Sequence, residues 1–211
     1  MRPISRFWKT AFAGLMGGAV LCAVATARAA DEPDPKKLKP TYGLFGLGLH
    51  VEAGAGVYQV VGQGGWVPGI YPRVGAELHI GPHLSIPVIA RLQTSVDQGT
   101  PDFAQMSVSA GLNFRLRELE WPVALVVGAG VRVGKFTASK ALTDANFDPA
   151  TPDQGAQNAI GFPLSPEGTA KVEWWVAAPL AIKASVTYSP TFMPDQVIHN
   201  VEEAVAVALV F

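Results

Sequence analysis

The sequence predicts an all-β fold, an eight-stranded antiparallel β-barrel of up-and-down topology that spans a membrane. Three observations lead to this expectation. From residue 42 onward, apolar residues alternate with small or polar residues at the period of two that is typical of β-strands. Only 16% of the residues are charged and 49% are hydrophobic, whereas soluble domains carry roughly 25% charged residues. The chain also ends on alternating apolar residues that finish with an aromatic one, Phe211.

Eight segments carry the alternation, and they span residues 45–58, 70–80, 84–93, 105–116, 123–133, 170–176, 182–188 and 201–211. In the first, Leu47, Leu49 and Val51 share one face, opposite Gly48 and His50. The next three segments start their apolar faces at Ile70, Leu84 and Met106, and their polar faces at Tyr71, Ser85 and Gln105. The last four start their apolar faces at Val123, Ala170, Ile182 and Val201. An even number of strands allows each strand to be antiparallel to both neighbours.

The first 29 residues have the pattern of a secretory signal peptide. Basic residues precede an apolar run from Ala11 to Ala27, and Ala27-Arg28-Ala29 fits a cleavage site. An uncleaved anchor is the alternative, but the run is short for a membrane span. We expect a signal peptide over 1–29, a flexible periplasmic leader over 30–41 and the barrel over 42–211. The single cysteine, Cys22, lies in the signal region, so the exported chain is expected to have no disulfide.

Alternation alone does not show which face points outward, because a soluble sandwich or lipocalin-like barrel buries its apolar face. The polar faces combine charges with many glycines and alanines, which suits a narrow interior. The links after the second, fourth and sixth segments are short, and those after the others are longer, with the longest running from Lys135 to Pro166. Short turns on one side and long loops on the other are typical of outer-membrane barrels. The net charge of −1 gives no reason to expect nucleic-acid binding.

The end of the chain resembles the closing strand of bacterial outer-membrane barrels, which typically finish on an aromatic residue. Phe211 follows Leu209, Val207 and Val205 at every second position, and we interpret these four residues as an assembly signal. With the signal peptide and the eight segments, the chain is similar to the OmpA/OmpX-type eight-stranded barrel family, including opacity-like surface proteins. The resemblance implies a Gram-negative outer-membrane location, contact with outer-membrane lipid, assembly by the barrel assembly machinery, no cofactor and no enzymatic activity.

Ten charged residues fall on the predicted inward faces and form a candidate lumen network. They are Glu52, Arg73, Glu77, Arg91, Arg115, Arg132, Lys171, Glu173, Lys183 and Glu202. The interior of an eight-stranded barrel is just filled by side chains, and an isolated buried charge costs several kcal/mol. We therefore expect the charges to pair into a plug, and a narrow or gated ion path is the alternative.

Other motifs give weaker signals. The His83-Leu84-Ser85 sequence resembles the His-x-Ser pair of outer-membrane lipid A deacylases, but its position at a short turn and its inward parity disfavour catalysis. Gly128, Gly130 and Gly134 do not have the spacing of a phosphate loop. The acidic residues of the longest link lack the spacing of a calcium loop, and the histidines show no i, i+4 pair, so we expect no metal.

Two residues fit the barrel less well. Pro87 lies in mid-strand, where a missing N–H predicts a β-bulge. Glu203 falls on the lipid-facing parity. The sequence thus predicts a non-enzymatic, monomeric barrel whose role is structural or depends on an extracellular ligand bound by the loop at 135–167. A small pore and a lipid-modifying enzyme are the alternatives.

Overall fold

A computed structural model describes residues 47–95, 103–116, 122–143, 157–161, 163–177, 179–193 and 196–211. Its elements are β1 (Leu47–Val61), β2 (Trp66–Ile80), β3 (Leu84–Thr94), β4 (Phe103–Leu116), β5 (Val123–Ser139), α2 (Lys140–Thr143), β6 (Gln157–Gly161), β7 (Leu164–Ala177), β8 (Leu180–Phe192) and β9 (Val197–Val210). The expected signal peptide, the leader and the first residues of the first predicted strand lie outside the described residues. Within the described residues, no helix is both long enough and apolar enough to cross a membrane.

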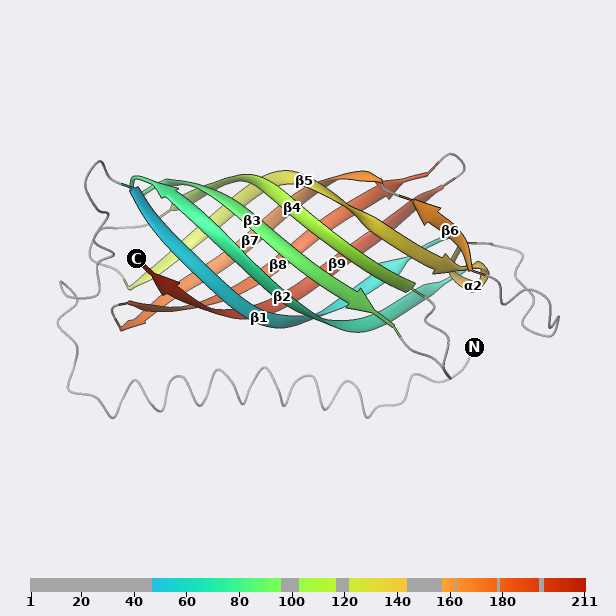
Figure 1. The fold of residues 1–211 in the computed structure, drawn as a ribbon, viewed down its shortest axis with the longest axis horizontal. Helices are drawn as coiled ribbons and strands as arrows, with labels where there is room; N and C mark the ends of the chain where they lie inside the picture. Colours follow the sequence, from blue (N-terminus) through green and yellow to red (C-terminus); the bar gives the residue numbers. More distant parts are fainter. Residues whose placement is uncertain are drawn as a thin grey trace.

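Eight of the strands form one closed antiparallel barrel. The sheet runs in the order β4-β3-β2-β1-β9-β8-β7-β5, and the pairing of β4 with β5 closes it. Consecutive strands are neighbours throughout, which is the up-and-down topology that the sequence predicts. Figure 1 shows the strands winding around a common axis, with α2 and β6 at one end and the C-terminus at the other. We call these the loop end and the turn end.

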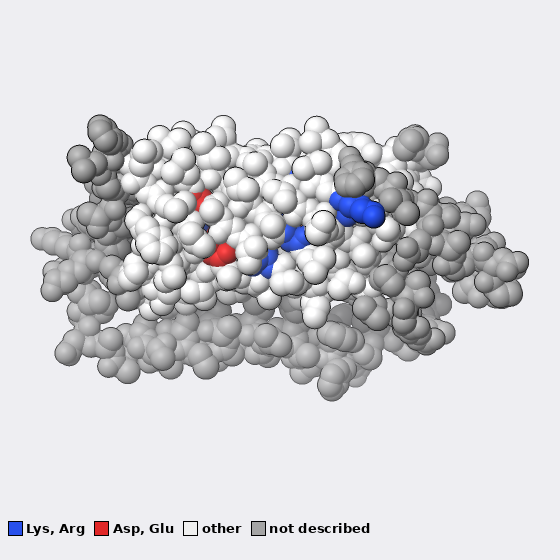
Figure 2. All heavy atoms as spheres, viewed as in Figure 1, with Lys and Arg blue, Asp and Glu red and all other residues white. Residues whose placement is uncertain are grey.

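The polarity of the barrel is reversed relative to that of a soluble protein. Among the described residues, 26 polar or charged residues are buried against 15 hydrophobic ones. Aliphatic side chains instead cover the outside; Ile70, Val74 and Leu125, for example, are more than half exposed. The wall facing the viewer in Figure 2 is accordingly mostly white, with a few patches of acidic and basic side chains showing between uncharged residues. This arrangement confirms the prediction that the apolar faces point outward.

The long link after the fifth predicted strand is more ordered than the sequence predicts. β5 continues to Ser139, and β6 pairs with its last residues, from Phe136 to Ser139. Because β5 pairs with β6 and β7 in the same register, β6 continues the line of β7 after a short break. Part of the expected loop at 135–167 is therefore a β-hairpin, formed by β6 and the end of β5, and this end of β5 also pairs with the first residues of β4. The connection of the hairpin, residues 140–156, includes the short helix α2.

The predicted alternation of short and long links holds only in part. The link between β1 and β2 is four residues, 62–65, and that between β8 and β9 is also four residues, 193–196. Both were expected to be longer, because the apolar alternation is interrupted by Gly62, Gly64 and Gly65 in the first case and by Pro194 in the second. In the first link, Gly62 donates a backbone hydrogen bond to Gly65 at 2.9 Å, which gives a tight hairpin turn.

The expected bulge at Pro87 is wrong. Pro87 stands opposite Glu77 in β2, and the register of β2 against β3 is the same on both sides of it. On the other side, the ladder between β3 and β4 lacks pairs at Ile86 and Pro87 but resumes at Val88 without a shift. The barrel therefore accommodates the missing N–H by omitting pairs on one side rather than by inserting a residue.

Candidate functional site in the barrel lumen

The ten charged residues predicted for the lumen all lie inside the barrel and are almost fully buried, with relative exposures between 0% and 6%. They reach the interior because they sit on the same face of their strands as the small residues, which leave room for long side chains. Each takes part in at least one ion pair. The structure divides them into two groups along the barrel axis.

The group nearer the turn end is centred on Glu77. One oxygen of its carboxylate accepts hydrogen bonds from Ser85 at 2.5 Å and Asn113 at 2.8 Å. The other lies 2.7 Å from the ammonium groups of both Lys171 and Lys183. Five neighbours from four other strands thus converge on this one side chain when Arg115, at 3.9 Å, is included.

The remaining acids of this group share the same cations. Glu173 pairs with Arg115 at 2.7 Å and with Lys171 at 3.2 Å. Glu52 pairs with Arg73 at 2.5 Å and with Lys183 at 2.9 Å. Because every acid contacts two or more cations, the group is a continuous network and not a set of separate pairs. Such a network compensates the large cost of removing charges from water only when it is complete.

The group nearer the loop end contains an acid that the sequence analysis missed. Glu167 pairs with Arg91 at 3.1 Å and with Arg132 at 2.8 Å. Glu202 also pairs with both arginines, at 3.0 Å to Arg91. The sixth predicted strand began at Ala170, because Pro166 and Gly168 interrupt the apolar pattern. Glu167 lies an even number of residues before the inward-facing Lys171 and Glu173, so it shares their face of the strand. This parity was the signal that could have identified it.

Two histidines meet beside Glu77. The ring centroids of His50 and His79 are 3.7 Å apart, because β1 and β2 pair side by side there. With Glu77 they offer ligand atoms within 4.8 Å of one another. Arginine can only donate, so His79 Nδ1 accepts the 2.6 Å hydrogen bond from Arg115. A divalent cation would have to displace Arg115 and compete with two lysines for Glu77, and we assign no metal to these residues.

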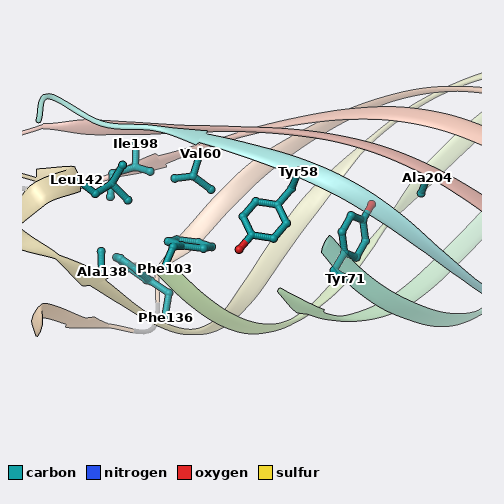
Figure 3. Close-up of a cluster of buried hydrophobic side chains, with 9 residues drawn as sticks. All are labelled: Tyr58, Val60, Tyr71, Phe103, Phe136, Ala138, Leu142, Ile198 and Ala204. Carbon is teal, nitrogen blue, oxygen red and sulfur yellow. The ribbon is translucent and has the colours of Figure 1, made fainter. Parts of the chain in front are cut away.

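Clusters of buried apolar side chains lie near both ends of the lumen. At the loop end, a seal is formed by a cluster of buried side chains that extends in Figure 3 from Leu142 inward to Tyr71 and Ala204: Tyr58, Val60, Tyr71, Phe103, Phe136, Ala138, Leu142, Ile198 and Ala204. Leu142 belongs to α2 and is completely buried, and its carbonyl accepts a hydrogen bond from Gly64 in the β1–β2 turn at 3.0 Å. At the turn end, Trp175 packs with Ala124, Ala181 and Ala208. The sequence analysis did not identify either layer.

The remaining candidate motifs do not form catalytic sites. Ser85 is fully buried and donates its hydroxyl hydrogen to Glu77, whereas His83 bonds the carbonyl of Arg115 at 3.0 Å. The two side chains therefore have different partners, and Ser85 faces the lumen and not the lipid. Gly128 and Gly130 lie in mid-strand in β5, where they line the lumen. The acidic residues Asp144, Asp148 and Asp153 lie outside the described residues.

The residues of the expected assembly signal lie in β9 and directly after it. Val207, Leu209 and Phe211 are exposed on the outer face at 50%, 46% and 68%, and Val205 is half-buried on the same face. Phe211 exchanges two backbone hydrogen bonds with Leu49 of β1, at 2.8 and 3.1 Å. The last residue of the chain therefore belongs to the seam that joins the final strand to the first.

Comparisons with known proteins identify the fold. No protein-family model matches the sequence, and no curated protein matches it. Among solved structures, Neisserial surface protein A matches with a TM-score of 0.61 and 16% identity, over 76% of this chain and 96% of that one. Ail, the attachment invasion locus protein of Yersinia pestis, matches with a TM-score of 0.52 and 16% identity, over 78% and 98%. The outer membrane protein OprG from Pseudomonas aeruginosa matches with a TM-score of 0.51 and 8% identity, over 81% and 98%. The chain has the eight-stranded β-barrel fold of the OmpA/OmpX-type outer-membrane proteins.

Proposed function

We propose that the protein is a non-enzymatic barrel of the bacterial outer membrane that conducts no solutes and acts through its loop end, as a structural or surface-interaction protein. The observation that carries the proposal is the filled lumen within an apolar outer wall. The exposed aliphatic face suits lipid, because a soluble protein rarely exposes an apolar patch of more than a few hundred Å². The lumen between the two apolar layers is occupied by ion-paired side chains.

The rival function is a small pore, and the charged residues along the axis are the observation that favours it. A pore needs a continuous aqueous path, whereas here Leu142 and the aromatic residues around it cover one end of the charges and Trp175 covers the other. Within each group, the acidic and basic side chains also form ion pairs with one another at 2.5–3.2 Å. These contacts support a plug that is held in place by its own network.

We expect liposomes that contain the purified protein to show no sugar-dependent swelling, and planar bilayers to show no stable conductance steps. The matched comparison is the double variant Tyr58→Ala/Leu142→Gly, which thins the loop-end seal and leaves every lumen charge in place. If the wild-type barrel conducts as strongly as a porin, the lumen charges line a pore and the non-conducting proposal is wrong.

The loop end is the part of the molecule that we propose to face the cell exterior. The first strand then rises from the periplasm, and the link at 140–156 joins β5 to β6 at the outer end. We expect an epitope inserted near Pro152 to be labelled on intact cells, and one inserted at Glu118 only after the outer membrane is opened. Both insertion sites lie outside the described residues. Labelling of the Glu118 epitope first on intact cells would show that the barrel has the opposite orientation.

We propose that any ligand of the loop end belongs to a different class from the one seen with a structural neighbour. Ail has been solved in complex with the heparin analogue sucrose octasulfate. The link at 140–156 in this chain carries Asp144, Asp148 and Asp153 against a single Lys140. An excess of acids disfavours a polyanion, so we propose that any partner of this loop is neutral or basic.

A further inference from the structure

The lumen contains a small cavity between the two groups of charges, lined by both polar and apolar residues. Its volume is about 20 Å³, and a buried water needs roughly 10–15 Å³ on the same measure. Three glycines of β4 and β5 leave room for the cavity: Gly111 stands opposite Gly130, and Gly128 lies two residues before Gly130 on the same face of β5. The space therefore accepts a guest of about the size of a water molecule or a small ion.

The opposite side of the cavity is lined by two cations and several hydroxyl groups. Arg73 donates a hydrogen bond to Ser185 at 2.9 Å, and Lys171 stands opposite Ser185 in the pairing of β7 with β8. Thr169 and Thr187 lie on the same wall, and Glu167 is the one acid among the lining residues. Arg73 is 3% exposed, and its Nε has no hydrogen-bond partner among the described residues. The lining thus carries a positive charge and a spare donor.

The described part of the lumen has the same imbalance. Its ion-paired cations are Arg73, Arg91, Arg115, Arg132, Lys171 and Lys183, and their partners are Glu52, Glu77, Glu167, Glu173 and Glu202. Six cations against five carboxylates leave one positive charge in excess in the described part of the lumen. A buried charge that lacks compensation is strongly unfavourable, so a counter-charge inside the barrel would stabilise the fold.

We propose that this cavity is a binding site for one small monovalent anion, chloride in a physiological medium, held by Arg73, Lys171 and the hydroxyl groups around them. Chloride is only slightly larger than water and accepts hydrogen bonds from guanidinium, ammonium and hydroxyl donors. It brings the lumen to neutrality without adding a divalent charge. Because apolar layers cover both ends, the anion acts as a structural ion of the barrel and not as a conducted species.

The direct test is a crystal structure of the protein grown in bromide, with diffraction recorded at the bromine absorption edge. We expect an anomalous peak in the cavity within hydrogen-bond distance of Arg73 and Ser185. Bromide that binds only on the outer surface, with water alone in the cavity, would overturn the proposal.

The solution test is thermal unfolding in detergent, with sodium chloride compared with sodium gluconate at equal ionic strength. Gluconate is too large for the cavity. We expect the ratio of folded to unfolded protein to rise about tenfold for each tenfold rise in chloride above its dissociation constant, because a ligand of the folded state stabilises it by mass action, and to stay constant in gluconate. The same response to both salts would show that no anion is bound.

Three variants locate the effect. Lys171→Gln makes the lumen neutral and is expected to abolish the chloride dependence. Thr187→Val keeps every charge and nearly the same shape but removes a lining hydroxyl, so it should raise the chloride concentration needed for half of the effect. Thr191→Val is the matched control, because Thr191 bonds Ser165 in the lumen at 2.8 Å and does not line the cavity. If Lys171→Gln and Thr187→Val respond to chloride as the wild type and the control do, the anion does not bind in this cavity.

Discussion

Replacing Glu77 with glutamine is expected to destabilise the barrel by about 3–5 kcal/mol, the usual cost of removing one partner from a buried ion pair. Glu77→Gln keeps the size of the side chain and can still accept hydrogen bonds from Ser85 and Asn113. It removes the charge that lies 2.7 Å from both Lys171 and Lys183. We expect the midpoint of urea unfolding in detergent to fall strongly, and the fraction of heat-modifiable protein on unboiled gels to fall with it.

A control and a rescue variant separate the network from a general loss of charge. Glu203→Gln neutralises a carboxylate that lies on the lipid-facing side of β9, and it should change stability by no more than about 0.5 kcal/mol. In the double variant Glu77→Gln/Lys171→Met, one of the cations left without its partner is also removed, so part of the stability should return. Additive losses in this cycle would mean that Glu77 and Lys171 do not interact.

Deleting Phe211 is expected to reduce the yield of folded barrel in the outer membrane several-fold. The deletion removes two backbone hydrogen bonds to Leu49 at the seam between β9 and β1, each of which contributes about 1 kcal/mol. It also removes an exposed aromatic side chain from the end of the lipid-facing row, where aromatic residues anchor a barrel at the membrane interface. The measurement is the amount of heat-modifiable protein in the outer-membrane fraction.

Val210→Ala is the matched control for the deletion. Val210 lies next to Phe211, but it packs inward against the turn-end layer around Trp175. Its truncation removes buried contacts and leaves the terminal aromatic residue and the seam intact. We expect a smaller loss of barrel yield than for the deletion. Equal yields from the two variants would contradict the assignment of Phe211 to the assembly signal.

The fold of this protein could be predicted from its sequence because alternation is a local property. A period of two places Val205, Val207 and Leu209 on one face of a strand whatever the rest of the chain does. Low overall charge and inward-facing residues such as Glu77 and Lys171 then decide that the polar face is the inner one. The same reasoning failed where local signals conflicted. Pro166 and Gly168 hid the first half of β7 and, with it, Glu167.

The pairing of the lumen charges was decided by the tertiary structure alone. Parity places a side chain inside the barrel, but its partner depends on the register between strands that are far apart in sequence. Lys183 meets Glu77 across 106 residues, and no local pattern contains that information. The contact between His50 and His79 likewise follows from the pairing of β1 with β2.

The loop-end seal and the cavity have the same origin. The seal requires α2 to fold back so that Leu142 reaches the barrel mouth, and the cavity requires glycines of two neighbouring strands to stand side by side. The sequence by itself determined the strands, their faces and the sense of the barrel, because these depend on residues within one strand. The ion pairs, the seals and the cavity depend on closure of the sheet, which brings distant side chains into a space too narrow to leave them unpartnered.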